Sequence, residues 1–283
     1  MSSKRFLDRM VTLVTGAGSG YGAGIAKLFA EEGAIVVVLD FNEKGAMKVV
    51  SELTTAGHSA HFVRLDITNA ADWTSVVQNV KTRFGRIDVV VNNAGWTYRR
   101  KSSLKVTEAE FDRKHWDFSW LPLCATIVIR ANTSWPYPGV FDTNVKGIFH
   151  SVNAVMPQFV SQGSGSMINI SSSLTAKPVN GLLYYIATKG AVDLITRGLA
   201  SEYASRGIRV NGVQPSMGNT ALASDFVGQT FDSDVQGVKA AQIPLGRLCT
   251  PLDVARACLY FASPFFNEFQ TGITLRVDGG QNA

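Results

Sequence analysis

The chain has 283 residues, of which 46% are hydrophobic and 17% charged, and its formal net charge is +5. This composition supports a sizeable buried core and excludes an intrinsically disordered or collagen-like chain. The longest apolar stretch, 121–129, is about half of what a membrane-spanning helix needs, so we expect no contact with a membrane.

Short β-branched runs alternate with longer amphipathic stretches. The expected strands are Val11–Thr15, Ala34–Leu39, Ala60–Leu65, Ile87–Asn92, Ser166–Ser171, Ile208–Val213 and Gly272–Val277. The expected helices lie near residues 21–32, 43–56, 70–84, 141–160, 180–205 and 251–263. Most of these strands are apolar on both faces, which is typical of parallel strands covered on both sides. The sequence therefore predicts an α/β fold: one doubly wound domain over residues 1–283 with about seven parallel strands.

Residues 114–139 interrupt this alternation inside what otherwise reads as one helix, and three prolines forbid a continuous helix there. Removing these 26 residues leaves 257 and restores the helix. Two interpretations stay open. The first, which we favour, is a retained intron, since the amino acids at both ends can be encoded by codons that contain splice sites. The second is a genuine insertion that forms a lid or an interface.

A glycine-rich turn follows the first expected strand and precedes a helix, in the order VTLVTGAGSGYG over residues 11–22. Such a turn lets the backbone approach a pyrophosphate, which the helix N-terminus also attracts. The second strand leads into Asp40, whose carboxylate suits a ribose diol and repels a 2′-phosphate. No Arg or Lys occupies Ala17, Ser19 or Phe41. These features favour NAD over NADP as the cofactor.

Other classes of function have little support in the sequence. No serine has glycines at both flanking positions of a hydrolase elbow, and the glycine turn lacks the Gly-Lys-Ser/Thr of a P-loop. The four histidines have no ligand-forming neighbours, so we expect no metal. The three cysteines show no CxxC spacing, which indicates a reducing compartment, and the cytoplasm is the expected location. The densest basic cluster (Arg99, Arg100, Lys101 and Lys105) is interpreted as a solvated loop that meets an anionic ligand rather than nucleic acid.

An ordered set of motifs covers nearly the whole chain outside residues 114–139. The motifs are Thr15-Gly16-x3-Gly20-x-Gly22, Asp66 in LDIT, Asn92-Asn93-Ala94-Gly95, Asn144 in NVKG, Ser172 in NISSS, Tyr185-x3-Lys189, Pro215 through Thr220, and Val277-Asp278-Gly279-Gly280. In this order they resemble the short-chain dehydrogenase/reductase family. The resemblance implies a Rossmann fold and an NAD(P)-dependent oxidoreductase acting on CH–OH groups. Tyr21 stands where the family usually has Ile or Leu, and Ser216 where it usually has Gly.

The resemblance also implies roles for individual residues. Asp66 and the neighbouring backbone would hold the adenine, Asn93 would line the cofactor cleft, and Thr220 would touch the nicotinamide carboxamide. The expected cofactor-binding set is Gly16, Ser19, Gly20, Tyr21, Gly22, Asp40, Asp66, Ile67, Asn93, Ala94, Gly95, Tyr185, Lys189 and Thr220. Asn144 would anchor a water that relays protons to Lys189.

Tyr185 and Lys189 are the expected catalytic pair, because residues four apart share one face of a helix. A nearby ammonium favours the phenolate, so Lys189 is expected to lower the pKa of Tyr185, the general acid/base. Lys189 would also hold the nicotinamide ribose, and Ser172 would hydrogen-bond the substrate oxygen. Tyr184, the competing phenol, is expected to line the pocket or pack.

The predicted function is the interconversion of a secondary alcohol and a ketone by hydride transfer. The substrate is expected to be a small apolar or aromatic molecule, because Trp96, Tyr98, Phe226 and Phe231 lie in the segments that would build its pocket. The alternatives are an NADPH-dependent reductase of 3-oxoacyl thioesters and a cofactor-binding protein inactivated by residues 114–139. The resemblance implies a homodimer or homotetramer.

Overall fold

The sheet has seven strands, all parallel, in the order β3-β2-β1-β4-β5-β6-β7. A computed structural model describes residues 5–112 and 139–283. The strands are β1 (Val11–Thr15), β2 (Ile35–Asp40), β3 (Ala60–Arg64), β4 (Val89–Asn92), β5 (Gly165–Ile170), β6 (Ile208–Pro215) and β7 (Thr274–Val277). The prediction of a doubly wound α/β sheet is confirmed, with strand ends that differ by one or two residues.

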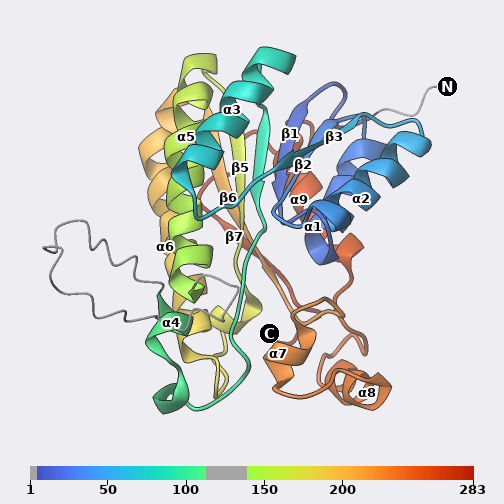
Figure 1. Ribbon diagram of the computed structural model, residues 1–283, viewed down its shortest axis with the longest axis vertical. Helices are drawn as coiled ribbons and strands as arrows, with labels where there is room; N and C mark the ends of the chain where they lie inside the picture. The colour runs from blue at the N-terminus through green and yellow to red at the C-terminus, as the bar shows by residue number, and fades with distance from the viewer. Residues whose placement is uncertain (1–4, 113–138) are drawn as a thin grey trace, which may run out of the picture.

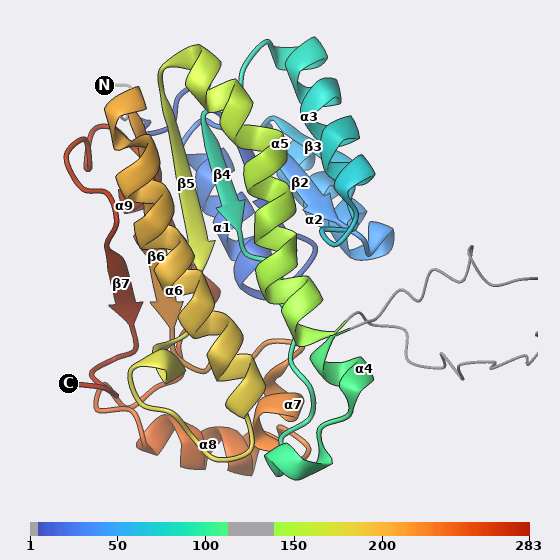
Figure 2. The same cartoon turned by 90° about the vertical axis from the view of Figure 1, so that its left-hand side faces the viewer.

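Helices cover both faces of the sheet (Figures 1 and 2). They are α1 (Gly20–Glu31), α2 (Glu43–Thr55), α3 (Ala70–Phe84), α4 (Glu108–Phe111), α5 (Gly147–Gln162), α6 (Leu183–Tyr203), α7 (Ala223–Val227), α8 (Ser233–Ala241) and α9 (Pro251–Ala262). Side chains of α1, α2 and α9 form one buried cluster with the sheet, and side chains of α3, α5 and α6 form the other. Successive residues of β1 enter opposite clusters, which explains why this strand is apolar on both faces.

Two short helices, α7 and α8, were not predicted from the sequence. They follow β6 and lie beneath the carboxyl ends of the strands (Figure 2). Asp232 caps α8 through Val235 N, but α8 has no buried residue and therefore little apolar periodicity. Helix patterns are read from buried faces, so a peripheral helix of this kind gives a weak signal.

The expected long helix over 141–160 begins with a π-helical turn, Asp142–Lys146, before α5. On the other side of the undescribed segment, α4 ends at Phe111, and Asp112 has an extended backbone. The two ends lie together: a Cβ added to Gly139 would come within 2.6 Å of Asp112 Cα, and the rings of Phe111 and Phe141 are 4.6 Å apart. The expectations about residues 114–138 lie outside the described residues.

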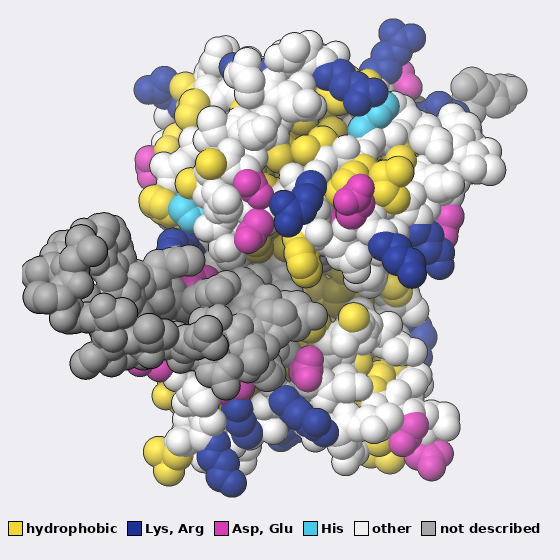
Figure 3. Space-filling model, viewed as in Figure 1, with side chains coloured by type: hydrophobic (Ala, Val, Ile, Leu, Met, Phe, Trp, Pro, Cys, Tyr) yellow, Lys and Arg dark blue, Asp and Glu magenta, His cyan; other side chains and the backbone are white. Residues whose placement is uncertain are grey.

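The described residues bear on two of the expectations about partners, through the length of the helices and through the charges on one face of the molecule. Among the described residues, no helix is both long and apolar enough to cross a bilayer. On the face seen in Figure 3, Lys and Arg side chains are spread out and interspersed with Asp and Glu.

Candidate active site

A cavity of about 1020 Å³ opens at the carboxyl edge of the sheet. Segments that follow β1, β2, β3, β4, β5 and β6 all contribute to its walls. The strand order reverses between β1 and β4, and open α/β sheets bind ligands in the crevice at such a reversal. The cavity therefore lies where the fold leaves room for a nucleotide.

The glycine-rich turn is packed against the loop that follows β4. Gly16 has a positive φ of 63°, and a Cβ there would come within 2.9 Å of Ala94 Cα. Asn93 holds the turn, since its Nδ2 donates to Thr15 O at 2.9 Å and to Gly16 O at 3.3 Å. Ser19, at the start of α1, makes no side-chain capping hydrogen bond. This glycine cradle before a helix N-terminus fits a pyrophosphate.

Two carboxylates, Asp40 and Asp66, line the same end of the cavity. Asp40 Oδ2 accepts from Gly18 N and Asp40 Oδ1 from Asn42 N, both at 2.8 Å. Asp66 Oδ1 accepts from the backbone and the hydroxyl of Thr68. Their positions are thus fixed by hydrogen bonds, and the negative charge of Asp40 stands beside the glycine turn.

Nearly all the residues predicted from the sequence line this one cavity. They are Gly16, Ser19, Gly20, Tyr21, Asp40, Asp66, Ile67, Asn93, Ala94, Gly95, Ser172, Tyr185, Lys189 and Thr220. Gly22 and Asn144 are not among the lining residues. Gly22 lies behind the turn, where a Cβ would come within 2.2 Å of Gly16 O, so its contribution is close packing.

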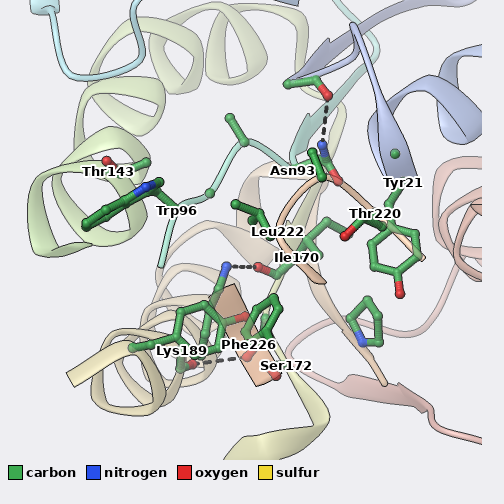
Figure 4. Close-up of a pocket in the computed structure, with 18 of the residues that line it drawn as sticks. Tyr21, Asn93, Trp96, Thr143, Ile170, Ser172, Lys189, Thr220, Leu222 and Phe226 are labelled. Carbon is green, nitrogen blue, oxygen red and sulfur yellow. Dashed lines mark hydrogen bonds between the residues drawn. The ribbon is translucent and has the colours of Figure 1, made fainter. Parts of the chain in front are cut away.

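Ser172 and Lys189 lie on one wall of the cavity (Figure 4), and Tyr185, which interacts with the Ser172 hydroxyl, lines the cavity beside them. Ser172 follows β5, while Tyr185 and Lys189 lie one turn apart on α6, and all three are buried. Lys189 Nζ donates to Ile170 O at 2.8 Å and lies 5.8 Å from the centroid of the Tyr185 ring. Ser171 Oγ donates to Lys189 O, which ties α6 to the end of β5.

The sequence predicted that the pKa of Tyr185 is lowered, but the surroundings of Tyr185 in the structure raise it. Burial raises the pKa of Tyr185 to about 12, although the neighbouring Ser172 hydroxyl acts to lower it. Burial also lowers the pKa of Lys189 to about 8, against the opposing effect of Asp193. Desolvation disfavours the charged form of each group, and it sets the direction of both shifts.

Asn144 lies in the π-helical turn, and both polar atoms of its side chain make hydrogen bonds. Its Oδ1 accepts from Trp96 N, and its Nδ2 donates to Trp96 O and Thr188 Oγ1. A Cβ on Gly95 would lie 3.2 Å from Asn144 Oδ1 and 3.4 Å from Lys189 Nζ, so the two side chains flank Gly95. The amide of Asn144 therefore joins the loop after β4 to α6.

An apolar wall completes the cavity beside Tyr185. Trp96 and Phe226 line it as expected, and the Phe226 ring meets the Tyr185 ring edge-on at 5.0 Å. Two expected aromatic residues do not line it. Tyr98 is fully buried and uses its hydroxyl to accept from Tyr184 N, and Phe231 lies outside the lining.

The wall also contains residues that the sequence did not single out as pocket-forming. Leu222 and Ile243 flank the unpredicted helices α7 and α8. Tyr184, the competing phenol, packs edge-on against Phe111 at 5.2 Å and is absent from the lining. Within the part of the chain that the structure describes, no three His, Cys, Asp or Glu residues gather in a way that suits a metal ion.

Comparison with known proteins agrees with this geometry. A family model described as short chain dehydrogenase matches residues 10–229. The chain is 37% identical to 4-formylbenzenesulfonate dehydrogenase of Comamonas testosteroni, with 98% of this chain and 99% of that protein covered. It is 35% identical to 2,5-dichloro-2,5-cyclohexadiene-1,4-diol dehydrogenase of Sphingobium indicum, with 95% of each covered.

Reductases are also among the similar proteins. A 3-oxoacyl-[acyl-carrier-protein] reductase of Staphylococcus aureus is 34% identical, with 95% of this chain and 96% of that protein covered. Among solved structures, the 3-ketoacyl-(acyl-carrier-protein) reductase of Brucella melitensis complexed with NADH has a TM-score of 0.82 at 33% identity. It covers 98% of this chain and 100% of its own.

Proposed function

Because the chain belongs to the short-chain dehydrogenase/reductase family and is an NAD(P)-dependent oxidoreductase of alcohol and keto groups, we propose that Tyr185, Lys189 and Ser172 carry its reaction. The observation that supports this most is their meeting on one buried wall of the cavity that also contains the glycine turn. The proposed reaction is the interconversion of a small apolar or aromatic secondary alcohol and its ketone.

We propose NAD rather than NADP as the cofactor. The Asp40 carboxylate, fixed by Gly18 N and Asn42 N, stands where it suits a ribose diol and repels a 2′-phosphate. Asp66 and Ile67 would hold the adenine, the glycine turn the pyrophosphate, and Thr220 the carboxamide. When bound, the nicotinamide would supply the hydride acceptor or donor.

The remaining step is the movement of one proton, and the chain's own residues perform it. The Ser172 hydroxyl would hydrogen-bond the substrate oxygen and hold it against the Tyr185 phenol. Since burial raises the pKa of Tyr185 to about 12, the neutral phenol is its resting form and acts as the acid in ketone reduction. In alcohol oxidation the phenolate must form, and the positive charges of Lys189 and of the oxidised nicotinamide favour it.

Lys189 would also hold the nicotinamide ribose. An ammonium has three donors, and Ile170 O accepts from one of them, so two remain for a ribose hydroxyl and a water. We propose that Asn144 contributes such a water through its main chain, because its side-chain amide already bonds Trp96 and Thr188.

We further propose that the working protein is a single domain from which residues 114–139 are absent. Asp112 and Gly139 already lie in contact, so a direct junction near them requires little movement of α4 or α5. The assembly is proposed to be a homodimer or homotetramer, since Phe149 of α5 and Leu194 of α6 are 60% and 62% exposed. The cytoplasm is the proposed location, because Cys249 and Cys258 are buried, unpaired thiols.

A second candidate is the reduction of 3-oxoacyl thioesters with NADPH, which the similarity to 3-oxoacyl reductases favours. The test is steady-state turnover of the full chain with NAD and NADP on a panel of secondary alcohols, and with NADH and NADPH on ketones and 3-oxoacyl thioesters. We expect the alcohols and ketones to react, with NAD(H) preferred. Preference for NADPH and thioesters would favour the second candidate. Cofactor binding without turnover of any compound would indicate an inactive binding protein.

A further inference from the structure

The basic cluster Arg99, Arg100, Lys101 and Lys105 does not act as a single solvated patch. Arg99 Nε and Nη2 donate to Gly228 O at 3.1 and 3.0 Å. Lys101 Nζ pairs with Glu110 at 2.5 Å, and Lys105 is exposed. Arg100, in contrast, lines the cavity.

The stem of Arg100 is wedged between two distant segments. Its backbone N donates to Asp225 O at 2.8 Å, and the next residue, Lys101, donates to Gly181 O at 3.1 Å. A Cβ on Gly181 would come within 2.8 Å of Arg100 Cγ, and one on Gly228 within 3.3 Å of Arg100 Cβ. The first carbons of the side chain are thereby held between the start of α6 and the end of α7, beside the apolar wall that contains Phe226.

No hydrogen bond or ion pair engages the Arg100 guanidinium within residues 5–112 and 139–283. Asp225, an acid on the same wall, interacts electrostatically with Arg99. Burial raises the pKa of Asp225, and the positive charge of Arg99 lowers it. The lysines of the lining have partners: Lys239 Nζ lies 3.5 Å from Gln242 Oε1, Lys146 pairs with Asp142, and Lys189 donates to Ile170 O. Arg100 thus lines the cavity, and its guanidinium has no partner among the described residues.

We propose that Arg100 binds an oxyanion carried by the substrate, so that the substrate is an alcohol or ketone with a carboxylate or sulfonate on an apolar body. This inference rests on the proposed function, because it assumes that the alcohol or ketone occupies the cavity beside Tyr185. A guanidinium matches the two oxygens of such a group with two parallel hydrogen bonds. The apolar wall accommodates the body of the molecule, and Arg100 selects its charged end.

The experiment compares three probes of one shape: 4-acetylbenzoate, 4-acetylbenzenesulfonate and the neutral methyl 4-acetylbenzoate. Binding to the full chain with NADH is followed by quenching of tryptophan fluorescence, since Trp96 lines the cavity. In the unmodified chain, one or both anions should bind about 10- to 100-fold more tightly than the ester, as expected for charge-assisted hydrogen bonds. Anion binding should weaken as salt is added, whereas ester binding should not.

Arg100→Gln should abolish the preference for the anions and leave ester binding unchanged. Arg100→Lys, which keeps the charge but loses the fork, should retain part of it, and Lys105→Gln, the matched control from the same cluster, should retain all of it. Equal binding of ester and anions by the unmodified chain would overturn the proposal. An anion preference that survives Arg100→Gln would also overturn it.

Turnover of the same probes separates this inference from the proposed function. If the ester is reduced and the anions have no advantage in binding, only the inference fails. If no probe and no ketone of the panel is reduced, while anion binding still depends on Arg100, the oxyanion site at Arg100 is retained and the proposed function fails.

Discussion

In the cofactor half of the cavity, the loops after β1, β2 and β4 hold one another through side-chain hydrogen bonds to backbone, as Asn93 and Asp40 illustrate. In the substrate half, which comprises residues 96–101, 179–182 and 221–226, two backbone hydrogen bonds join the segments, from Arg100 N to Asp225 O and from Lys101 N to Gly181 O. Its lining side chains, Leu222 and Phe226 among them, are mostly apolar. A change of side chain in the cofactor half therefore disturbs the framework, whereas one in the substrate half reshapes the pocket.

The largest expected effect is that of Tyr185→Phe, which removes the proposed acid and leaves both halves of the cavity in place. We expect kcat to fall by about 10³-fold, within the range for loss of a general acid. The Kd for NADH, measured by fluorescence, should change little. Tyr184→Phe is the control, because Tyr184 packs against Phe111 outside the lining. Similar losses in the two variants would contradict the assignment.

Phe226→Ala tests the substrate half alone. The Phe226 ring meets Tyr185 edge-on at 5.0 Å, and loss of such an aromatic contact together with its buried area should lower kcat/KM for aromatic alcohols by about tenfold. Phe231→Ala, outside the lining, should not change it. If Phe226→Ala weakens NADH binding as much as it weakens turnover, the two halves of the cavity are not independent.

Asp40→Asn is the matching test of the cofactor half. The substitution removes the charge and keeps an oxygen for one of the hydrogen bonds from Gly18 N and Asn42 N. The ratio of kcat/KM for NAD to that for NADP should fall about tenfold, because repulsion of a 2′-phosphate is relieved. Glu43→Gln, at the exposed start of α2, is the control. An unchanged ratio would remove Asp40 as the discriminating group.

Deletion of residues 114–139 probes the junction between α4 and α5. Closing a 26-residue loop costs about 3 kcal/mol, so the deletion should raise Tm by about 5 °C as well as increase soluble yield and activity. A Gly/Ser segment of equal length in place of 114–139 separates the effect of loop length from that of the apolar run. Equal turnover and Tm in the 283- and 257-residue chains would contradict the proposal.

The smallest expected effect is a pH dependence of stability. Burial lowers the pKa of Lys189 from 10.5 to about 8, so the unfolded chain binds more protons at this residue between these pH values. The free energy of unfolding, relative to that of Lys189→Met, should therefore rise with pH in this window, by at most about 1.4 kcal/mol per pH unit. Urea denaturation at pH 7.5, 8.5 and 9.5 measures it. For Lys105→Met, which replaces an exposed lysine, the difference in free energy of unfolding should not change with pH. A difference for Lys189→Met that falls as pH rises would contradict the prediction.

The sequence by itself determined the parallel sheet, the glycine turn and the positions of Asp40, Tyr185 and Lys189. These features depend on local rules: alternation of apolar runs, glycine where the backbone must turn, and helical spacing. Only the tertiary structure decided the direction of the Tyr185 pKa, because desolvation depends on everything that surrounds the phenol. It also decided the helices α7 and α8, which bury no residue or almost none of their own.

Arg100 also separates what the sequence determines from what only the tertiary structure decides. In the sequence it is one of four neighbouring cations, and nothing local distinguishes it from Arg99 or Lys101. The fold brings Gly228 to Arg99 and Glu110 to Lys101, and it places Gly181 beneath the stem of Arg100. The partners of a charged side chain are set by contacts between distant segments, so the proposal for Arg100 depends on how the fold assembles those segments.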